Sequence, residues 1–246
     1  MTRRDSWLSL TAVATDHRVN VFCFPFAGGG ASFYRAWRPL APATIALCPL
    51  QPPGREERFG EPPFASMPPL VQAASDALLP FLSRPYALLG HSMGALTCFE
   101  IVRELRGRGA PLPVHLFVSG APAPHLAARI PPIYDLPEDR LLEAIQRYGG
   151  LPGEVLRSRE LLAVLIPRWR ADLAVTGTYV YAERPPLPCP ITAFGGTSDA
   201  VVPPASVEAW REHTLSSSRC EILDGGHFFI ADHARAIVET IARALA

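Results

Sequence analysis

The sequence predicts a single α/β domain, residues 1–246, built on a mostly parallel sheet with helices on both faces. Short apolar segments with strand composition alternate along the chain with segments whose apolar residues recur at helical spacing. The 246 residues, 48% of them hydrophobic, can bury one sizeable core, and α/β folds of this length are routinely single domains. Residues 86–106 also show a strand, a tight glycine turn and a helix in direct succession.

Six segments have the composition expected of strands. Each is short, apolar and rich in β-branched or aromatic residues, and loop-forming residues border it. In chain order these segments are residues 19–24, 44–48, 86–89, 115–118, 191–194 and 220–223. Between them, apolar residues at helical spacing predict helices over residues 32–40, 68–82, 95–106, 204–213 and 233–245.

One region, from about residue 124 to residue 188, interrupts this alternation. It contains two helical patterns, residues 138–148, ended by Gly149-Gly150, and residues 158–175, bent by Pro167. We expect a helical insertion over the sheet edge that acts as a lid and shapes a substrate channel, because such insertions carry function in parallel sheets. A simple pair of covering helices is the alternative.

Charge and cysteine content limit the classes of function. Lys and Arg number 23, as do Asp and Glu, so the net charge is zero and nothing indicates a nucleic-acid or anionic-membrane surface. The five cysteines show neither C-x-x-C nor zinc-ligand spacing, so we expect buried thiols in a reducing compartment and no metal or cofactor.

The amino-terminal segment lacks the features of a complete targeting signal. Thr2-Arg3-Arg4 resembles the start of a twin-arginine signal, but the apolar stretch after it, residues 7–14, is short and interrupted. No run of residues is long and apolar enough to span a membrane. A cytoplasmic location is therefore expected.

The most informative motif is Gly90-His91-Ser92-Met93-Gly94, which has the form G-x-S-x-G. Between a strand and a helix, this pattern is typical of a nucleophile elbow, in which a serine is held in a strained conformation at the tip of a sharp turn. The glycines remove side chains that would collide in the turn, and the positive end of the helix dipole points at the hydroxyl. The alternative is an ordinary serine N-cap in a glycine-rich turn.

A serine nucleophile needs a general base, and the base needs an orienting acid. Of the seven histidines, His227 is the best placed, because it lies in a glycine-rich loop after the last strand. Asp199, in the loop after the preceding strand, is the expected acid and gives the order Ser, Asp, His along the chain. Asp224 is the rival but is expected to cap a turn, and Asp172 lies within the insertion.

The remaining histidines lack this loop context, and His91, inside the elbow, is expected to point away from the serine. They are His17, His91, His115, His125, His213 and His233.

An oxyanion hole requires backbone N–H donors. Met93, directly after the nucleophile, is expected to supply one, and Ala27, after the first strand, the other, with Gly28 as the second choice. The glycine run at residues 28–30 matches neither a P-loop nor a dinucleotide-binding pattern, which favours the oxyanion interpretation.

Four motifs together resemble those of type II thioesterases, the stand-alone editing enzymes of polyketide synthases and nonribosomal peptide synthetases, which have the α/β-hydrolase fold. The motifs are Val21-Phe22-Cys23-Phe24-Pro25-Phe26-Ala27-Gly28-Gly29, Gln51-Pro52-Pro53-Gly54-Arg55-Glu56, Gly90-His91-Ser92-Met93-Gly94-Ala95 and Gly225-Gly226-His227-Phe228-Phe229. The stretch before Gly54 departs slightly from the family, which usually has a leucine before Pro-Gly.

The resemblance implies a substrate and a partner. The substrate would be an acyl thioester on the phosphopantetheine arm of an acyl or peptidyl carrier protein, and the product a free acid, with no cofactor bound by the enzyme itself. We expect a monomer that clears stalled or aberrant acyl groups from antibiotic-type assembly lines. The alternatives are a small-molecule carboxylesterase or lipase of the same fold, and a non-catalytic module that only binds carrier proteins.

Overall fold

The computed structural model describes residues 7–8, 13, 16, 19–149 and 153–246. Some residues considered in the sequence analysis lie outside the described residues: Thr2-Arg3-Arg4, His17 and Gly150. No helix in the described ranges is long and apolar enough to cross a membrane.

Six strands form one sheet in the order β2-β1-β3-β4-β5-β6, and all neighbouring pairs are parallel. They are β1 (Val19–Phe24), β2 (Ile45–Pro49), β3 (Tyr86–His91), β4 (His115–Ser119), β5 (Ile191–Gly196) and β6 (Ser218–Leu223). The parallel α/β architecture expected from the sequence is confirmed. β3 and β5 extend two residues further than expected, because Gly90 and Gly195 still pair through their backbones with Val118 and Ile222.

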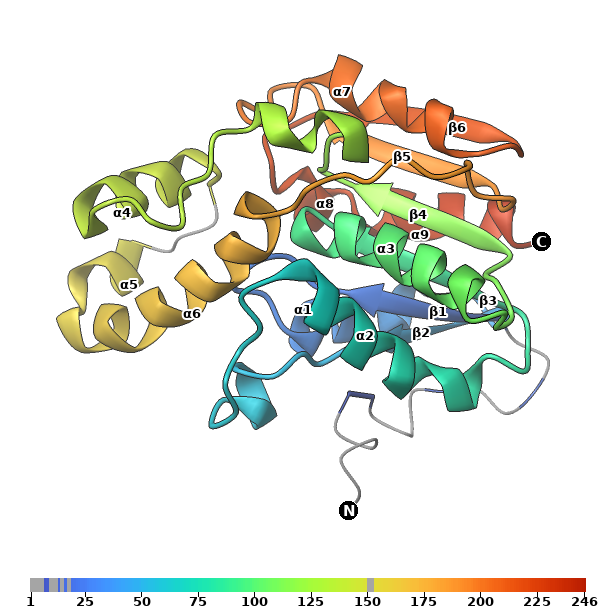
Figure 1. The fold of residues 1–246 in the computed structure, drawn as a ribbon, viewed down its shortest axis with the longest axis horizontal. Coiled ribbons are helices and arrows are strands. Elements are labelled where there is room, and N and C mark those ends of the chain that lie inside the picture. Colours follow the sequence, from blue (N-terminus) through green and yellow to red (C-terminus); the bar gives the residue numbers. More distant parts are fainter. Residues whose placement is uncertain (1–6, 9–12, 14–15, 17–18, 150–152) are drawn as a thin grey trace.

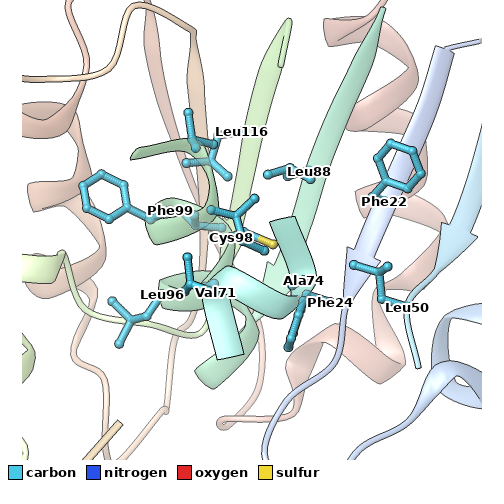
Figure 2. Close-up of a cluster of buried hydrophobic side chains, with 14 of the residues drawn as sticks. Phe22, Phe24, Leu50, Val71, Ala74, Leu88, Leu96, Cys98, Phe99 and Leu116 are labelled. Carbon is cyan, nitrogen blue, oxygen red and sulfur yellow. The ribbon is translucent and has the colours of Figure 1, made fainter. Parts of the chain in front are cut away.

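Helices cover both faces of this sheet, as Figure 1 shows. α2 (Met67–Leu78) and α3 (Met93–Gly107) pack on one face, where strand residues such as Phe22 and Phe24 point, in the cluster drawn in Figure 2. α1 (Ala31–Arg35), α8 (Phe229–Asp232) and α9 (Ala234–Ala244) pack on the other face, against Val21 and Cys23. Successive strand residues thus alternate between two apolar cores, as the pleat of a strand buried on both faces requires.

Several expected helices are divided. η3 (Arg38–Leu40) follows α1, η5 (Leu79–Phe81) follows α2, and η7 (Ala209–His213) follows α7 (Pro204–Glu208). Pro39 and Pro80 lie in the first two of these short helices, where the absence of an N–H group ends the α-helical hydrogen bonding. Two further short helices are η4 (Glu56–Arg58) and η6 (Pro124–Arg129).

The described part of the segment between β4 and β5 consists of helices joined by loops, with an isolated bridge at Leu187. α4 (Glu138–Arg147), α5 (Gly153–Arg157) and α6 (Arg159–Gly177) lie together beyond the carboxyl ends of the strands (Figure 1). They share a small apolar cluster centred on Leu141, Leu162 and Ile166. The sequence did not predict α5, and α6 runs through Pro167 as one helix. The helices therefore stand over the sheet edge at which the predicted site residues gather.

Candidate active site

The backbone at Ser92 has the strained conformation expected of a nucleophile elbow. Its φ of 54° and ψ of −118° are rare for a residue with a side chain. The Ser92 N–H donates to the Ser119 carbonyl at 2.8 Å, and the Ser92 carbonyl accepts from the Ala95 N–H at 3.0 Å. These bonds hold the turn between β3 and α3, so that Ser92 lies at the amino end of α3.

The two elbow glycines are required by close approach of the backbone. A Cβ atom at Gly90 would collide with the carbonyl of Gly94, and a Cβ atom at Gly94 would collide with the carbonyls of Phe24 and Pro25. The end of β1 can therefore lie directly against the elbow, which brings the loop after β1 to the serine.

Ser92, His227 and Asp199 form one chain of hydrogen bonds. His227 Nε2 lies 3.1 Å from Ser92 Oγ, and His227 Nδ1 lies 2.7 Å from Asp199 Oδ2. Because an ionised carboxylate only accepts, Nδ1 carries the proton and Nε2 is left to accept from the serine hydroxyl. The three predicted residues thus lie in the arrangement that a serine nucleophile, its general base and an orienting acid require.

The two loops that carry Asp199 and His227 are bonded to each other. The Ser198 N–H donates to the Gly225 carbonyl at 2.9 Å, and the Gly225 N–H donates to Thr197 Oγ1 at 3.1 Å. Because β5 and β6 are neighbours, both loops leave the same edge of the sheet. The separation of Asp199 and His227 is therefore set by hydrogen bonds between their two loops.

The environment of Asp199 favours its charged form. Burial alone raises the pKa of this carboxyl, but the hydrogen bond and charge of His227, with the N–H groups of Val202 and Val201, lower it overall. Those N–H groups lie 3.0 and 2.9 Å from Asp199 Oδ1. The rival, Asp224, instead accepts from Thr197 Oγ1 at 2.9 Å.

His91 lies behind His227, the predicted general base. Its Nδ1 is 3.0 Å from Ser119 Oγ, and its ring centroid is 5.1 Å from that of His227. Burial, followed by the charge of His227, lowers the pKa of His91 well below its usual value. The His91 side chain is therefore neutral, packs against the site and forms its hydrogen bond with Ser119 rather than with Ser92.

The backbone donors near Ser92 can now be distinguished. Within the described part of the chain, the N–H groups of Met93 and Ala27 donate to no protein acceptor, whereas the Gly28 N–H donates to Asp172 Oδ2 at 2.7 Å. Gly28 is thus occupied, which favours Ala27, the first choice from the sequence, as the donor opposite Met93.

Two cavities meet at Ser92, His227 and Tyr148. The larger, of about 220 Å³, extends under the insertion and is lined by Phe26, Val155, Leu165, Trp169 and Phe228 among others. The smaller, of about 70 Å³, runs toward η6 and is lined by Leu96, Ala127, Ile130 and Val202 among others. The Tyr148 ring, at the end of α4, contacts the His227 ring edge-on at 4.9 Å, so the insertion reaches the base directly.

The cysteines lie away from this chemistry. All five are thiols outside any disulfide, and four are buried as expected, but Cys220 is exposed, which corrects the expectation from the sequence. The reason is its position on β6, the edge strand of the sheet. In the described residues, no group of three or more His, Cys, Asp and Glu side chains could hold a metal ion.

A parallel sheet with a serine elbow after β3, an acid after β5 and a histidine after β6 defines a serine hydrolase of the α/β-hydrolase fold. The chain belongs to the Thioesterase domain family, which matches residues 19–245.

Individual relatives agree with this family. Gramicidin S biosynthesis protein GrsT from Aneurinibacillus migulanus is 37% identical over 241 residues, which cover 98% of this chain and 94% of GrsT. RedJ, a thioesterase from the prodiginine biosynthetic pathway in Streptomyces coelicolor, has a similar structure, with a TM-score of 0.86 at 37% identity and coverage of 99% and 100%. The type II thioesterase BorB from the borrelidin biosynthetic cluster gives a TM-score of 0.88 at 33% identity, with 100% of both chains covered.

Proposed function

We propose that the protein is a stand-alone type II thioesterase that hydrolyses acyl thioesters from the phosphopantetheine arm of acyl or peptidyl carrier proteins. It would thereby remove aberrant or stalled acyl groups during polyketide or nonribosomal peptide biosynthesis. The observation that carries this proposal is the bonded chain Ser92–His227–Asp199 at the junction of two apolar cavities, in a member of the Thioesterase domain family. The biosynthetic setting is supported by the relatives GrsT, of gramicidin S biosynthesis, RedJ, of the prodiginine pathway, and BorB, of the borrelidin cluster.

The proposed reaction has two halves. In the first, Ser92 Oγ attacks the thioester carbonyl while its proton passes to His227 Nε2, and the oxyanion is held by the N–H groups of Met93 and Ala27. The tetrahedral intermediate collapses, and the pantetheine sulfur leaves as a thiol with the proton from His227. In the second half, His227 takes a proton from water, the hydroxide attacks the acyl-serine, and the free acid leaves as the proton returns to Ser92. Asp199 stabilises the charged His227 in both halves.

The shape of the site fits a substrate that extends on both sides of its reactive carbonyl. The larger cavity is lined almost entirely by apolar side chains, and we assign it to the acyl chain. The thin pantetheine arm would then approach from the other side of Ser92. α4, α5 and α6 would form the lid of this channel, and a monomer in the cytoplasm would meet soluble carrier proteins there.

The test is hydrolysis of acyl carrier proteins that bear short, branched and long acyl chains. Wild-type protein is expected to release each free acid at a rate set by the chain, and Ser92→Ala to lower the rate by about 10⁴-fold or more. Ser216→Ala, in an exposed turn, is the matched control and should behave as wild type. Ser92→Ala with wild-type activity would refute the mechanism.

The same assay separates the alternatives. Faster turnover of simple oxygen esters than of carrier-bound thioesters would identify a carboxylesterase or lipase. Carrier-protein binding without turnover by the wild-type protein would identify a binding module.

A further inference from the structure

A buried ion pair, Arg55–Asp172, lies beside the active site without belonging to the catalytic chain. Arg55 Nη2 is 2.5 Å from Asp172 Oδ1, and the two side chains are only 10% and 4% exposed. Burial raises the pKa of Asp172 even though Arg55 and the Gly28 N–H oppose that shift. The cost of removing both charges from water offsets much of the attraction between them. A contribution to folding stability is therefore a weak explanation for this ion pair.

The second oxygen of Asp172 contacts the loop that supplies the proposed oxyanion donor. Asp172 Oδ2 accepts from the Gly28 N–H at 2.7 Å, and Gly28 has a φ of 79°. That N–H belongs to the peptide group between Ala27 and Gly28. Since peptide groups are planar, fixing this one leaves only the two dihedral angles of Ala27 to orient the preceding peptide, which carries the Ala27 N–H.

The segment from Gln51 to Glu56 holds the same loop from its other end. Gln51 Oε1 accepts from the Ala31 N–H at 2.9 Å, and Gln51 Nε2 donates to the Arg55 carbonyl at 3.0 Å. Glu56 Oε1 accepts from the Ser32 N–H at 3.1 Å. These side chains bond the first N–H groups of α1, so the motif at residues 51–56 anchors the end of the loop that enters α1 and, through Arg55 and Asp172, also holds Gly28.

The Trp169 side chain on α6 packs against the same glycine. A Cβ atom at Gly28 would lie 2.9 Å from Trp169 Nε1, so no larger residue fits here without displacing the indole. Trp169 also lines the larger cavity. One face of α6 therefore both bounds that cavity and fixes the loop.

We propose that Asp172, oriented by Arg55, is a positioning residue that aims the Ala27 N–H at the oxyanion. The carboxylate acts through the Gly28 peptide and touches no substrate atom. This inference rests on the proposed function, since it assigns a task within the same Ser92 reaction. It also gives the Pro53-Gly54-Arg55-Glu56 motif a physical role, because Arg55 is the residue that holds the carboxylate in place.

The test compares Asp172→Ala and Asp172→Asn with the wild-type protein. Asp172→Ala is expected to lower kcat by about 10²-fold with KM changed less than about threefold, as for loss of an oxyanion donor. Asp172→Asn keeps an oxygen that can accept from Gly28 and should lose less. Affinity for a trifluoromethyl ketone analogue of the acyl substrate, which forms a tetrahedral alkoxide on Ser92, should fall in proportion to kcat/KM across the series.

Glu100→Ala is the matched control for lost stability. Glu100 accepts from Arg103 and from the Tyr179 hydroxyl, both at 2.6 Å, and lines neither cavity at Ser92. It should lower the unfolding temperature while leaving kcat and the ketone affinity unchanged. The proposal is overturned if Asp172→Ala keeps wild-type kcat and ketone affinity, or if Asp172→Asn, which can still accept from Gly28, loses as much of both as Asp172→Ala.

The two proposals fail in different ways. In one outcome, the wild-type protein cleaves p-nitrophenyl esters but not acyl carrier proteins, and kcat still depends on Asp172. This result would refute the thioesterase proposal and support the positioning role. Wild-type protein that hydrolyses acyl carrier proteins with no dependence on Asp172 would do the reverse.

Discussion

Asp199 shows at the scale of one residue how the site is prepared before any substrate arrives. Its carboxylate accepts from His227 and from two backbone N–H groups. Burial raises its pKa, but these bonds, with the charge of His227, lower it by more. The carboxylate is thus ionised at neutral pH and fixes the proton of His227 on Nδ1. The nucleophile can therefore pass its proton to Nε2.

Asp199→Asn should remove this control. An amide that donates to Nδ1 would favour the wrong tautomer, so kcat is expected to fall by about 10⁴-fold with little change in KM. The measurement is steady-state release of free acid from an acyl carrier protein. Asp224→Asn is the control, because the Asp224 carboxylate accepts from Thr197, and this variant should leave kcat unchanged. A small effect at Asp199 with a large one at Asp224 would reverse the assignment.

The sequence indicates some of these residues well and others not at all. Ser92, Asp199 and His227 each lie in a glycine-containing loop after a strand, so local pattern and chain order identify them. Asp172 has no such pattern: it lies within a helix, and its partner Gly28 is 144 positions away. Only the packing of α6 against the loop after β1 shows what this carboxylate does.

At the scale of elements, the insertion consists of parts held in different ways. α6 is bonded to the body of the protein, since Arg168 donates to the carbonyls of Gly54 and Phe59, both at 3.1 Å. α4 reaches the site through the Tyr148 ring on His227. α6 is thus the fixed part of the proposed lid, and any movement of that lid would have to come from α4 and α5.

Leu165→Trp tests the assignment of the larger cavity to the acyl chain. Leu165 on α6 lines this space of about 220 Å³, and an indole there would fill part of it. We expect kcat/KM for a decanoyl carrier protein to fall about tenfold relative to an acetyl one, an effect in the range of one to two lost methylene contacts. The readout is the ratio of the two kcat/KM values.

Leu161→Trp is the control on the same helix. Leu161 is 49% exposed and lines neither cavity at Ser92, so its replacement should leave the ratio unchanged. An unchanged ratio for Leu165→Trp would place the acyl chain elsewhere.

The ends of elements were harder to predict than their existence. All six strands were anticipated, because apolar β-branched segments between loops are distinctive. The four-residue helix α8 was not predicted, whereas the helix expected over residues 233–245 is α9, which begins directly after His233. A hydrogen bond from His233 Nε2 to the Asp224 carbonyl, at 2.8 Å, fixes this corner from a distant loop.

At the scale of the whole molecule, histidines buried in the cores link folding to pH. His115 Nε2 lies 2.9 Å from Thr192 Oγ1, and its ring stacks on Phe117 with centroids 4.2 Å apart. Burial lowers the pKa of His115 to about 4, and burial followed by the charge of His125 lowers that of His213 to about 4. The sequence placed His115 only at a strand border, because strand order and register decide which neighbour it meets.

The sign of the resulting pH dependence follows from these shifts. In the unfolded chain a histidine titrates near about 6.5, so between pH 6.5 and 4 the unfolded state binds more protons than the folded state. The contribution of these histidines to the free energy of unfolding should be at its full value above pH 6.5. It should decrease as the pH drops, by about 1 to 2 kcal/mol per histidine at pH 5. Asp199, with its lowered pKa, adds a loss only at still lower pH.

Urea unfolding of the wild-type protein between pH 5 and pH 8 would measure this slope, with His115→Gln for comparison. The glutamine amide can still bond Thr192 but carries no titrating group, so the fall in unfolding free energy between pH 7 and pH 5 should shrink by the share of one histidine. Arg235, which is exposed on α9, offers a neutral control as Arg235→Gln, which should leave the slope unchanged. If wild type and His115→Gln lose the same free energy over this range, His115 is not held neutral by the fold, and the coupling must come from other groups.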